Sequence, residues 1–128
     1  MIVDTSAVVA ILLKEPEREE LLRKMAHARY RQLSAVSYME AGMVLTAHFG
    51  EVAEAALDNF LRQARIEPVP VTNAHAKGAL HAFRQYGKGR HKAGLNFGDC
   101  YSYALAKSVG EPLLFKGTDF GRTDVDVA

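Results

Sequence analysis

Short apolar segments alternate with longer segments of helical periodicity along this 128-residue chain, and this alternation constrains its fold more than any other feature. Segments such as Met1–Val3 and Leu113–Phe115 have the length of buried strands, whereas 37–49 and 51–65 carry apolar residues at helical spacing. Strands that alternate with helices in this way are typical of βαβ units, which build a parallel sheet. The sequence therefore predicts an α/β fold.

Turn residues and helix signals divide the chain into an ordered series of elements. The predicted strands are 1–5, 31–36, 66–71, 113–115 and 125–127, and the predicted helices are 6–13, 16–28, 37–49, 51–65, 73–86 and 96–109. Pro68 and Pro70 place the strand 66–71 at an edge, because proline cannot donate a hydrogen bond to a sheet ladder. Gly50 and Gly110 follow predicted helices at positions where a left-handed residue is commonly needed.

Length and composition favour one globular domain over residues 1–128. Apolar residues make up 48% and charged residues 24% of the chain, and no apolar stretch of about 18 residues could span a bilayer. The apolar opening lacks a basic n-region and contains Asp4, so it is not typical of a secretory signal, and we expect a cytoplasmic protein. Cys100 is the only cysteine, which excludes an internal disulfide and a cysteine-rich zinc site; we expect it to be buried.

Four carboxylates fall at predicted strand ends or near predicted helix starts. They are Asp4, Glu40, Asp99 and Asp119. In open parallel sheets, ligands bind beyond the carboxyl ends of the strands, so these acids could converge on one pocket. Mg²⁺ and Mn²⁺ prefer oxygen ligands. The set therefore indicates a divalent-metal site and hydrolysis of phosphate esters.

Each of these acids also has a purely local explanation. Asp4 could cap the helix that follows it, and Glu40 has capping-box spacing from Ser37. Asp99 would be favoured by the dipole of its own helix, and Asp119 lies in a turn-rich stretch where Asp is common.

Two further residues are candidates for holding the acids by hydrogen bonds. Ser6 lies close to Asp4 and could bind its carboxylate or simply cap the helix. Asp124 lies near Asp119 and is a candidate outer-shell residue.

Positive charge is concentrated in one part of the chain although the whole carries only +1. Residues 68–98 contain no Asp or Glu and carry +5. Four of their basic side chains lie in or beside a glycine-rich loop, and we expect these to attract a phosphate backbone: Arg84, Lys88, Arg90 and Lys92. A solvated loop without this role is the alternative. Neither a phosphate-binding glycine loop, nor a G-x-S-x-G elbow, nor zinc-ligand spacing is present.

The motifs together resemble the VapC-type toxins, which are PIN-domain ribonucleases, over essentially the full length of the chain. The resemblance is carried by an acid after the first strand, a Glu in the third helix, N-x-x-D at 96–99 and the tail from Leu113 to Asp124. Thr118 departs from the pattern, because a second acid often stands before the aspartate in this group.

The resemblance implies a three-layer α/β/α fold around a mostly parallel sheet of about five strands. It also implies a Mg²⁺- or Mn²⁺-dependent endoribonuclease that is the toxin of a type II toxin–antitoxin system. By the same resemblance the chain forms a homodimer and binds a VapB-like antitoxin. Asp4, Glu40, Asp99 and Asp119 would take the catalytic roles, with Asp4 and Asp99 as direct metal ligands. With RNA as the substrate, we expect the basic side chains Arg84, Lys88, Arg90 and Lys92 to hold the RNA backbone. The alternatives are a non-catalytic RNA- or protein-binding module of the same fold, a phosphatase, and a nuclease that acts on DNA.

Overall fold

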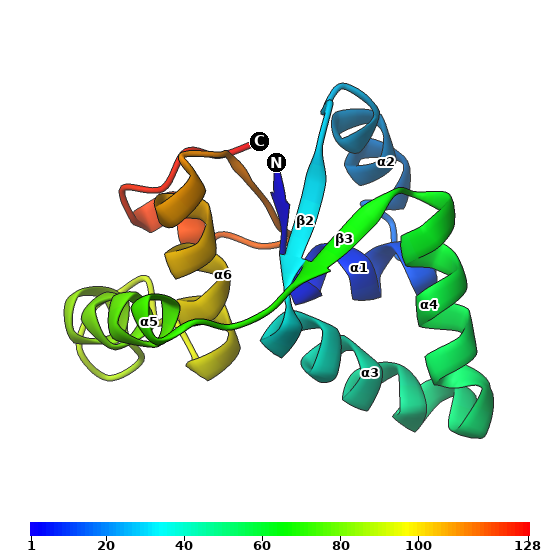
Figure 1. Cartoon of the computed structure of the whole chain (residues 1–128), viewed down its shortest axis with the longest axis horizontal. Coiled ribbons are helices and arrows are strands. Elements are labelled where there is room, and N and C mark those ends of the chain that lie inside the picture. The colour runs from blue at the N-terminus through cyan, green and yellow to red at the C-terminus, as the bar shows by residue number, and fades with distance from the viewer.

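A parallel sheet of four strands lies at the centre of the computed structural model, which describes all residues from 1 to 128 (Figure 1). Its strands are β1 (Ile2–Val3), β2 (Arg31–Ser34), β3 (Ile66–Val69) and β4 (Leu113–Leu114). The order across the sheet is β3-β2-β1-β4, and every pairing is parallel. β1 is central and β3, with Pro68, lies at an edge, as the sequence predicted.

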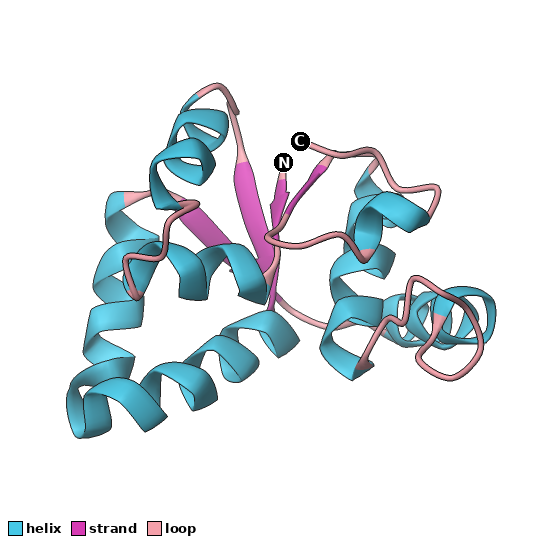
Figure 2. Ribbon diagram, turned by 180° about the vertical axis from the view of Figure 1, so that it is seen from behind, coloured by secondary structure: helices cyan, strands magenta, loops and turns pink.

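Helices cover both faces of this sheet. They are α1 (Thr5–Leu12), α2 (Arg18–Ala26), α3 (Ala35–Phe49), α4 (Ala53–Gln63), α5 (Asn73–Tyr86) and α6 (Phe97–Val109), with short 3₁₀ turns η1 (Gly50–Val52) and η2 (Phe120–Arg122). Figures 1 and 2 show α1 to α4 on one side and α5 with α6 on the other. The three-layer α/β/α prediction is therefore confirmed. No helix combines the length and the hydrophobicity that crossing a membrane requires.

Side-chain alternation along the short strands explains why there are two separate cores. Val3 and Leu114 pack into the cluster formed with α1 to α4, whereas Ile2 and Leu113 pack into the cluster formed with α5 and α6. Successive residues of a strand point to opposite faces, so two residues suffice to contact both layers. All four of these side chains are almost completely buried.

The predicted fifth strand, 125–127, is wrong. Only Val127 forms an isolated bridge, to Leu113, and the segment is tied to β4 by Leu113 N–H to Asp126 C=O (2.8 Å) and Ala128 N–H to Leu113 C=O (3.0 Å). Its alternating apolar residues resemble a strand, but Val127 is half exposed and has only one sheet residue to pair with.

The start of the third helix also differs from the prediction. α3 begins at Ala35, because the side chain of Ser34 accepts a hydrogen bond from the N–H of Val36 at 3.1 Å and caps the helix. β2 therefore ends at Ser34 and not at Val36. Ser37 lies inside α3 and is fully buried.

Candidate active site

Asp4 lies at the carboxyl end of the central strand and is only 2% exposed. Its backbone N–H donates to the C=O of Leu114 at 2.9 Å, which aligns it with the end of β4. Its carboxylate caps α1, since the N–H of Ser6 donates to Oδ2 at 2.9 Å. The capping explanation for Asp4 is thus correct, and it places a buried carboxylate at the centre of the sheet edge.

Glu40 extends from α3 toward the start of α6. A Cβ added to Gly98 would lie 2.5 Å from Oε2 and 2.6 Å from Oε1 of Glu40, so the carboxylate rests directly on the glycine backbone. The capping-box explanation for Glu40 is wrong, because Ser34 and not Ser37 caps α3. Glu40 is half-buried beside α6 and does not cap α3, so a role in the acidic cluster is left for its carboxylate.

Asp99 forms a reciprocal capping box with Asn96 at the start of α6. The N–H of Asn96 donates to Asp99 Oδ2 at 2.9 Å, and the N–H of Asp99 donates to Asn96 Oδ1 at 2.8 Å. The pKa of Asp99 is raised to about 7, mainly by burial and also by the negative charges of Asp4, Glu40 and Asp119, against the opposing effect of the hydrogen bond from Asn96. The other three predicted acids thus lie within electrostatic reach of the Asp99 carboxyl group.

The acidic cluster is open and not a closed cage. Asp119 is exposed and follows β4 just before η2, and no three His, Cys, Asp or Glu side chains already stand as a complete ligand set. The donor chemistry nevertheless fits a hard divalent cation, because carboxylate oxygens are its preferred ligands and their mutual repulsion is relieved by positive charge. Repulsion by Asp4, Glu40 and Asp119 adds to the effect of burial in raising the pKa of Asp99.

Ser6 occupies the position that the sequence predicted, whereas Asp124 does not contact the acids. Ser6 Oγ donates to Asp4 Oδ2 at 2.7 Å and accepts from the N–H of Lys116 at 3.0 Å. Asp124 instead binds the hydroxyl of Tyr103 (2.5 Å) and the ammonium of Lys107 (3.2 Å). Asp124 therefore does not hold the acids by hydrogen bonds, as the sequence analysis expected of an outer-shell residue.

Three residues at the site were missed by the sequence reasoning. Ser102 Oγ donates to Asp4 Oδ1 at 2.5 Å, and Ser37 Oγ lies 3.0 Å from Ser102 Oγ. Gly98 is the third, because its missing side chain admits Glu40. Spacing offered one signal, since Ser102 follows Asp99 by three residues and Ser37 precedes Glu40 by three, which places each pair on one helix face.

The four predicted RNA-binding side chains are exposed at and beyond the end of α5. Arg90 donates from Nε to the C=O of Arg84 at 3.2 Å and lies over the ring of Phe83 at 5.7 Å. None of the four, Lys88 and Lys92 included, forms an ion pair, so their charges remain available to a polyanion.

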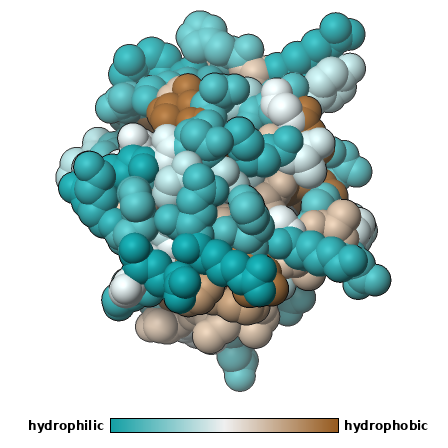
Figure 3. Space-filling view, turned by 90° about the vertical axis from the view of Figure 1, so that its left-hand side faces the viewer, coloured by the Kyte–Doolittle hydropathy of each residue, from teal (hydrophilic) through white to brown (hydrophobic).

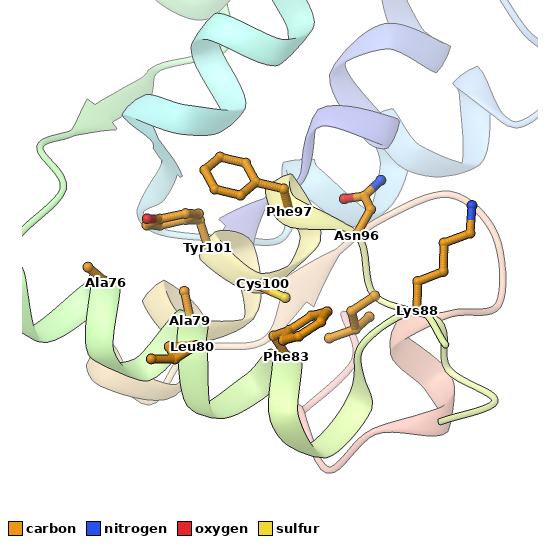
Figure 4. Close-up of a pocket in the computed structure, with 10 residues that line it drawn as sticks. Ala76, Ala79, Leu80, Phe83, Lys88, Asn96, Phe97, Cys100 and Tyr101 are labelled. Atoms are coloured by element: carbon orange, nitrogen blue, oxygen red, sulfur yellow. The ribbon is translucent and has the colours of Figure 1, made fainter. Parts of the chain in front are cut away.

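An apolar groove lies between α5 and the start of α6, and Lys88 of the basic loop is among its lining residues (Figure 4). Its volume is about 570 Å³, and its lining includes Leu80, Phe83, Lys88, Asn96 and Phe97. Phe97 is 74% exposed, so its ring forms part of the surface and not of the core. In Figure 3, which faces the α5 side, apolar atoms gather along the lower edge of the surface.

Comparison with known proteins identifies the class of protein that this fold and site define. The PIN domain family model matches residues 1–126. A ribonuclease VapC of Mycolicibacterium smegmatis is 50% identical over 125 residues, which are 98% of this chain and 97% of that protein. The chain therefore belongs to the PIN-domain family and to its VapC ribonucleases. Ribonucleases of this family depend on a divalent metal ion.

Solved structures show the same fold at low sequence identity. The VapC20 toxin of Mycobacterium tuberculosis, described as cleaving the sarcin-ricin loop, matches with a TM-score of 0.79 at 18% identity, over 99% of this chain and 97% of that one. A toxin–antitoxin complex from Klebsiella pneumoniae matches with a TM-score of 0.73 at 16% identity, over 99% and 95% of the two chains.

Proposed function

We propose that this protein is a metal-dependent endoribonuclease and the toxin of a type II toxin–antitoxin system. One observation carries the proposal: Asp4 lies at the end of the central strand, and the Glu40 carboxylate rests on Gly98, the residue before Asp99, so carboxylates from separate elements gather at one edge of the parallel sheet. Like charges gathered around the buried Asp4 and the half-buried Asp99 repel one another, and a bound divalent cation would relieve that repulsion. The VapC relative at 50% identity is itself a ribonuclease.

The metal that we propose is Mg²⁺ or Mn²⁺, with Asp4 and Asp99 as its direct ligands. When bound, such an ion acidifies a coordinated water and neutralises charge on the phosphate. The protein's own contribution is to hold the ligands in place. Asp4 accepts hydrogen bonds from hydroxyl and backbone donors, and Asp99 accepts one from the N–H of Asn96. The Glu40 carboxylate packs against the backbone of Gly98. Asp119, on an exposed turn, would complete the site from the β4 side.

The substrate that we propose is RNA, bound along the basic loop. These residues are exposed, form no ion pairs and lie within the acid-free stretch 68–98: Arg84, Lys88, Arg90 and Lys92. The acidic cluster repels a phosphate backbone, so positive charge beside it is needed to hold the strand. We propose a cytoplasmic location, where an RNA substrate is available.

The partners that we propose are a VapB-like antitoxin and a second copy of this chain. The structural neighbour from Klebsiella pneumoniae is a toxin–antitoxin complex, which supports the first. For the second, eight of the twelve large apolar side chains that stay exposed lie on α3, α5 and α6, among them Met39, Met43, Leu80, Phe83 and Phe97. Large apolar side chains left exposed in this way support contact with another protein.

Incubation of the purified protein with total RNA tests the enzymatic proposal most directly. We expect cleavage with Mg²⁺ or Mn²⁺, none in a chelator, and none by the Asp99→Asn variant. Cleavage that needs no metal, or that survives the substitution, would contradict the proposed chemistry. RNA binding without cleavage would favour the non-catalytic module, and cleavage confined to DNA or to small phosphoesters would replace RNA as the substrate.

A further inference from the structure

Two serines form a buried layer of hydroxyl groups beneath the acidic cluster. Ser102 and Ser37 both have 0% exposure, and they lie on α6 and α3, the helices that carry Asp99 and Glu40. Ser102 follows its acid by three residues and Ser37 precedes its acid by three, which is about one helical turn in each case. Thr5 connects α1 to these two serines, since its Oγ1 donates a hydrogen bond to the C=O of Ser37 at 3.4 Å.

The hydrogen bonds between these hydroxyls run in one direction. An ionised carboxylate can only accept, so Ser102 must donate its single proton to Asp4 Oδ1, at 2.5 Å. Ser102 then has no proton left for Ser37, and the 3.0 Å contact between the two hydroxyl oxygens requires Ser37 to donate to Ser102. The relay runs from Ser37 through Ser102 to Asp4.

The count of acceptor positions on Asp4 limits how this side chain can bind a cation. A carboxylate offers about four lone-pair sites, two on each oxygen. Oδ2 accepts from both the N–H and the hydroxyl of Ser6, and Oδ1 accepts from Ser102. One acceptor position is left, and it belongs to Oδ1, the oxygen that Ser102 orients.

We propose that Ser102 is a positioning residue that fixes the Asp4 carboxylate so that Oδ1 alone offers a lone pair to a divalent cation, with Ser37 holding the Ser102 hydroxyl in place. The inference rests on the metal site of the proposed function. Residues that hydrogen-bond a ligand from behind typically change metal affinity 10- to 100-fold when removed. Ser102 is suited to this role because burial protects its hydrogen bond from water.

Calorimetric titration of the metal-stripped protein with Mn²⁺ tests this role without reference to activity. We expect Ser102→Ala to weaken Mn²⁺ binding by about 10- to 100-fold, whereas Ser102→Thr, which keeps the hydroxyl, stays close to the unmodified protein. Ser108→Ala is the matched control, since Ser108 lies on the same helix but donates to the C=O of Leu105 at 2.8 Å. RNA cleavage by Ser102→Ala should recover as Mn²⁺ approaches saturation.

Each outcome decides the question. An unchanged Mn²⁺ affinity in folded Ser102→Ala, or a Thr variant as weak as the Ala variant, would overturn the proposal and leave the proposed function standing. If Ser102→Ala fails to fold, Ser37→Ala decides instead, with a smaller loss of affinity expected and an unchanged affinity contradicting the relay. An unmodified protein that binds no Mn²⁺ would overturn the metal site itself, and the proposed function with it.

Discussion

The carboxylate of Glu40 rests on the backbone of Gly98, and no other residue type leaves room for it. A Cβ at residue 98 would come within 2.5 Å of Oε2. We expect Gly98→Ala to lower RNA cleavage by about 100-fold, because a displacement of the order of 1 Å in a site group can cost that much. The free energy of unfolding should change little, since the end of a flexible side chain can move and Ala favours the helix.

Gly42→Ala provides the matched control for this substitution. Gly42 lies on α3 as Glu40 does, and a Cβ there would be 3.9 Å from Leu57 Cδ2, which is ordinary contact. The Gly42→Ala variant should keep the RNA cleavage activity, and its free energy of unfolding should be higher by about 0.5–1 kcal/mol. Full activity in Gly98→Ala would show that the position of Glu40 is unimportant.

Glu40→Gln separates charge from shape at the same position. Since Ser34 caps α3, we expect the free energy of unfolding to change by less than about 0.5 kcal/mol on chemical denaturation. Metal-dependent cleavage should fall by roughly tenfold or more, because Gln is a poor replacement for an anion at a metal site. Retained activity would rule out a charged role for Glu40.

Asp99 makes the metal-free protein less stable as the pH rises. Its pKa is about 7 in the folded protein and about 3.9 in an unfolded chain, so between these values the folded state binds the extra proton. The stability that this protonation contributes is therefore fully present below about pH 4 and disappears as the pH rises through 7. We expect Asp99→Asn, which can keep the bond from Asn96, to raise the free energy of unfolding at pH 8 by about 1–2 kcal/mol, less than the full shift implies because Asp99 is partly solvated.

Denaturation in chelator at pH 5 and pH 8 measures this effect. The free energies of unfolding of Asp99→Asn and of the unmodified protein should differ less at pH 5 than at pH 8. Mn²⁺ should stabilise only the unmodified protein, since binding to the folded state alone raises stability. A pH-independent difference would mean that Asp99 is charged throughout this range.

The basic loop should set the salt dependence of RNA binding. We expect Lys88→Glu with Arg90→Glu to weaken binding and to flatten its dependence on salt, by about 0.7 in log–log slope for each phosphate that the loop no longer neutralises. Arg23→Glu with Arg62→Glu is the control, since these exposed residues lie on α2 and α4, on the opposite side of the sheet (Figure 1). RNA binding is measured from low to moderate salt in the Asp99→Asn background, which prevents cleavage. An unchanged salt slope in the loop variant would show that the loop does not neutralise RNA phosphates.

The exposed apolar residues of α3 should contribute to self-association. Met43 is 61% exposed, and we expect Met43→Glu to weaken the homodimer by about 1–2 kcal/mol, measured by sedimentation. Val52→Glu is the control, because Val52 is 64% exposed but lies on η1, outside α3, α5 and α6. Equal association constants for the two variants would place the dimer contact elsewhere.

The periodicity of the sequence was sufficient to predict the three layers of the fold, but not to predict where every helix and strand begins and ends. Val3 and Leu114 are buried against one helical layer, and Ile2 and Leu113 against the other, as short apolar strands of a parallel sheet require. The start of α3 was misplaced because both Ser34 and Ser37 are good capping residues, and only the backbone conformation chose Ser34. The segment 125–127 alternates like a strand, yet pairing depends on a neighbour that only the tertiary structure supplies.

The sequence by itself determined which acids could meet, because the position of an acid after a strand or within a helix is a local property. The tertiary structure alone decided what holds them. Ser102 donates to Asp4 across 98 residues of chain, and Gly98 admits Glu40 from another helix. Asp124 is bound to Tyr103 and Lys107 and is not among the acids. These contacts depend on how α3 and α6 pack beside the central strand, and no periodicity within either helix encodes that packing.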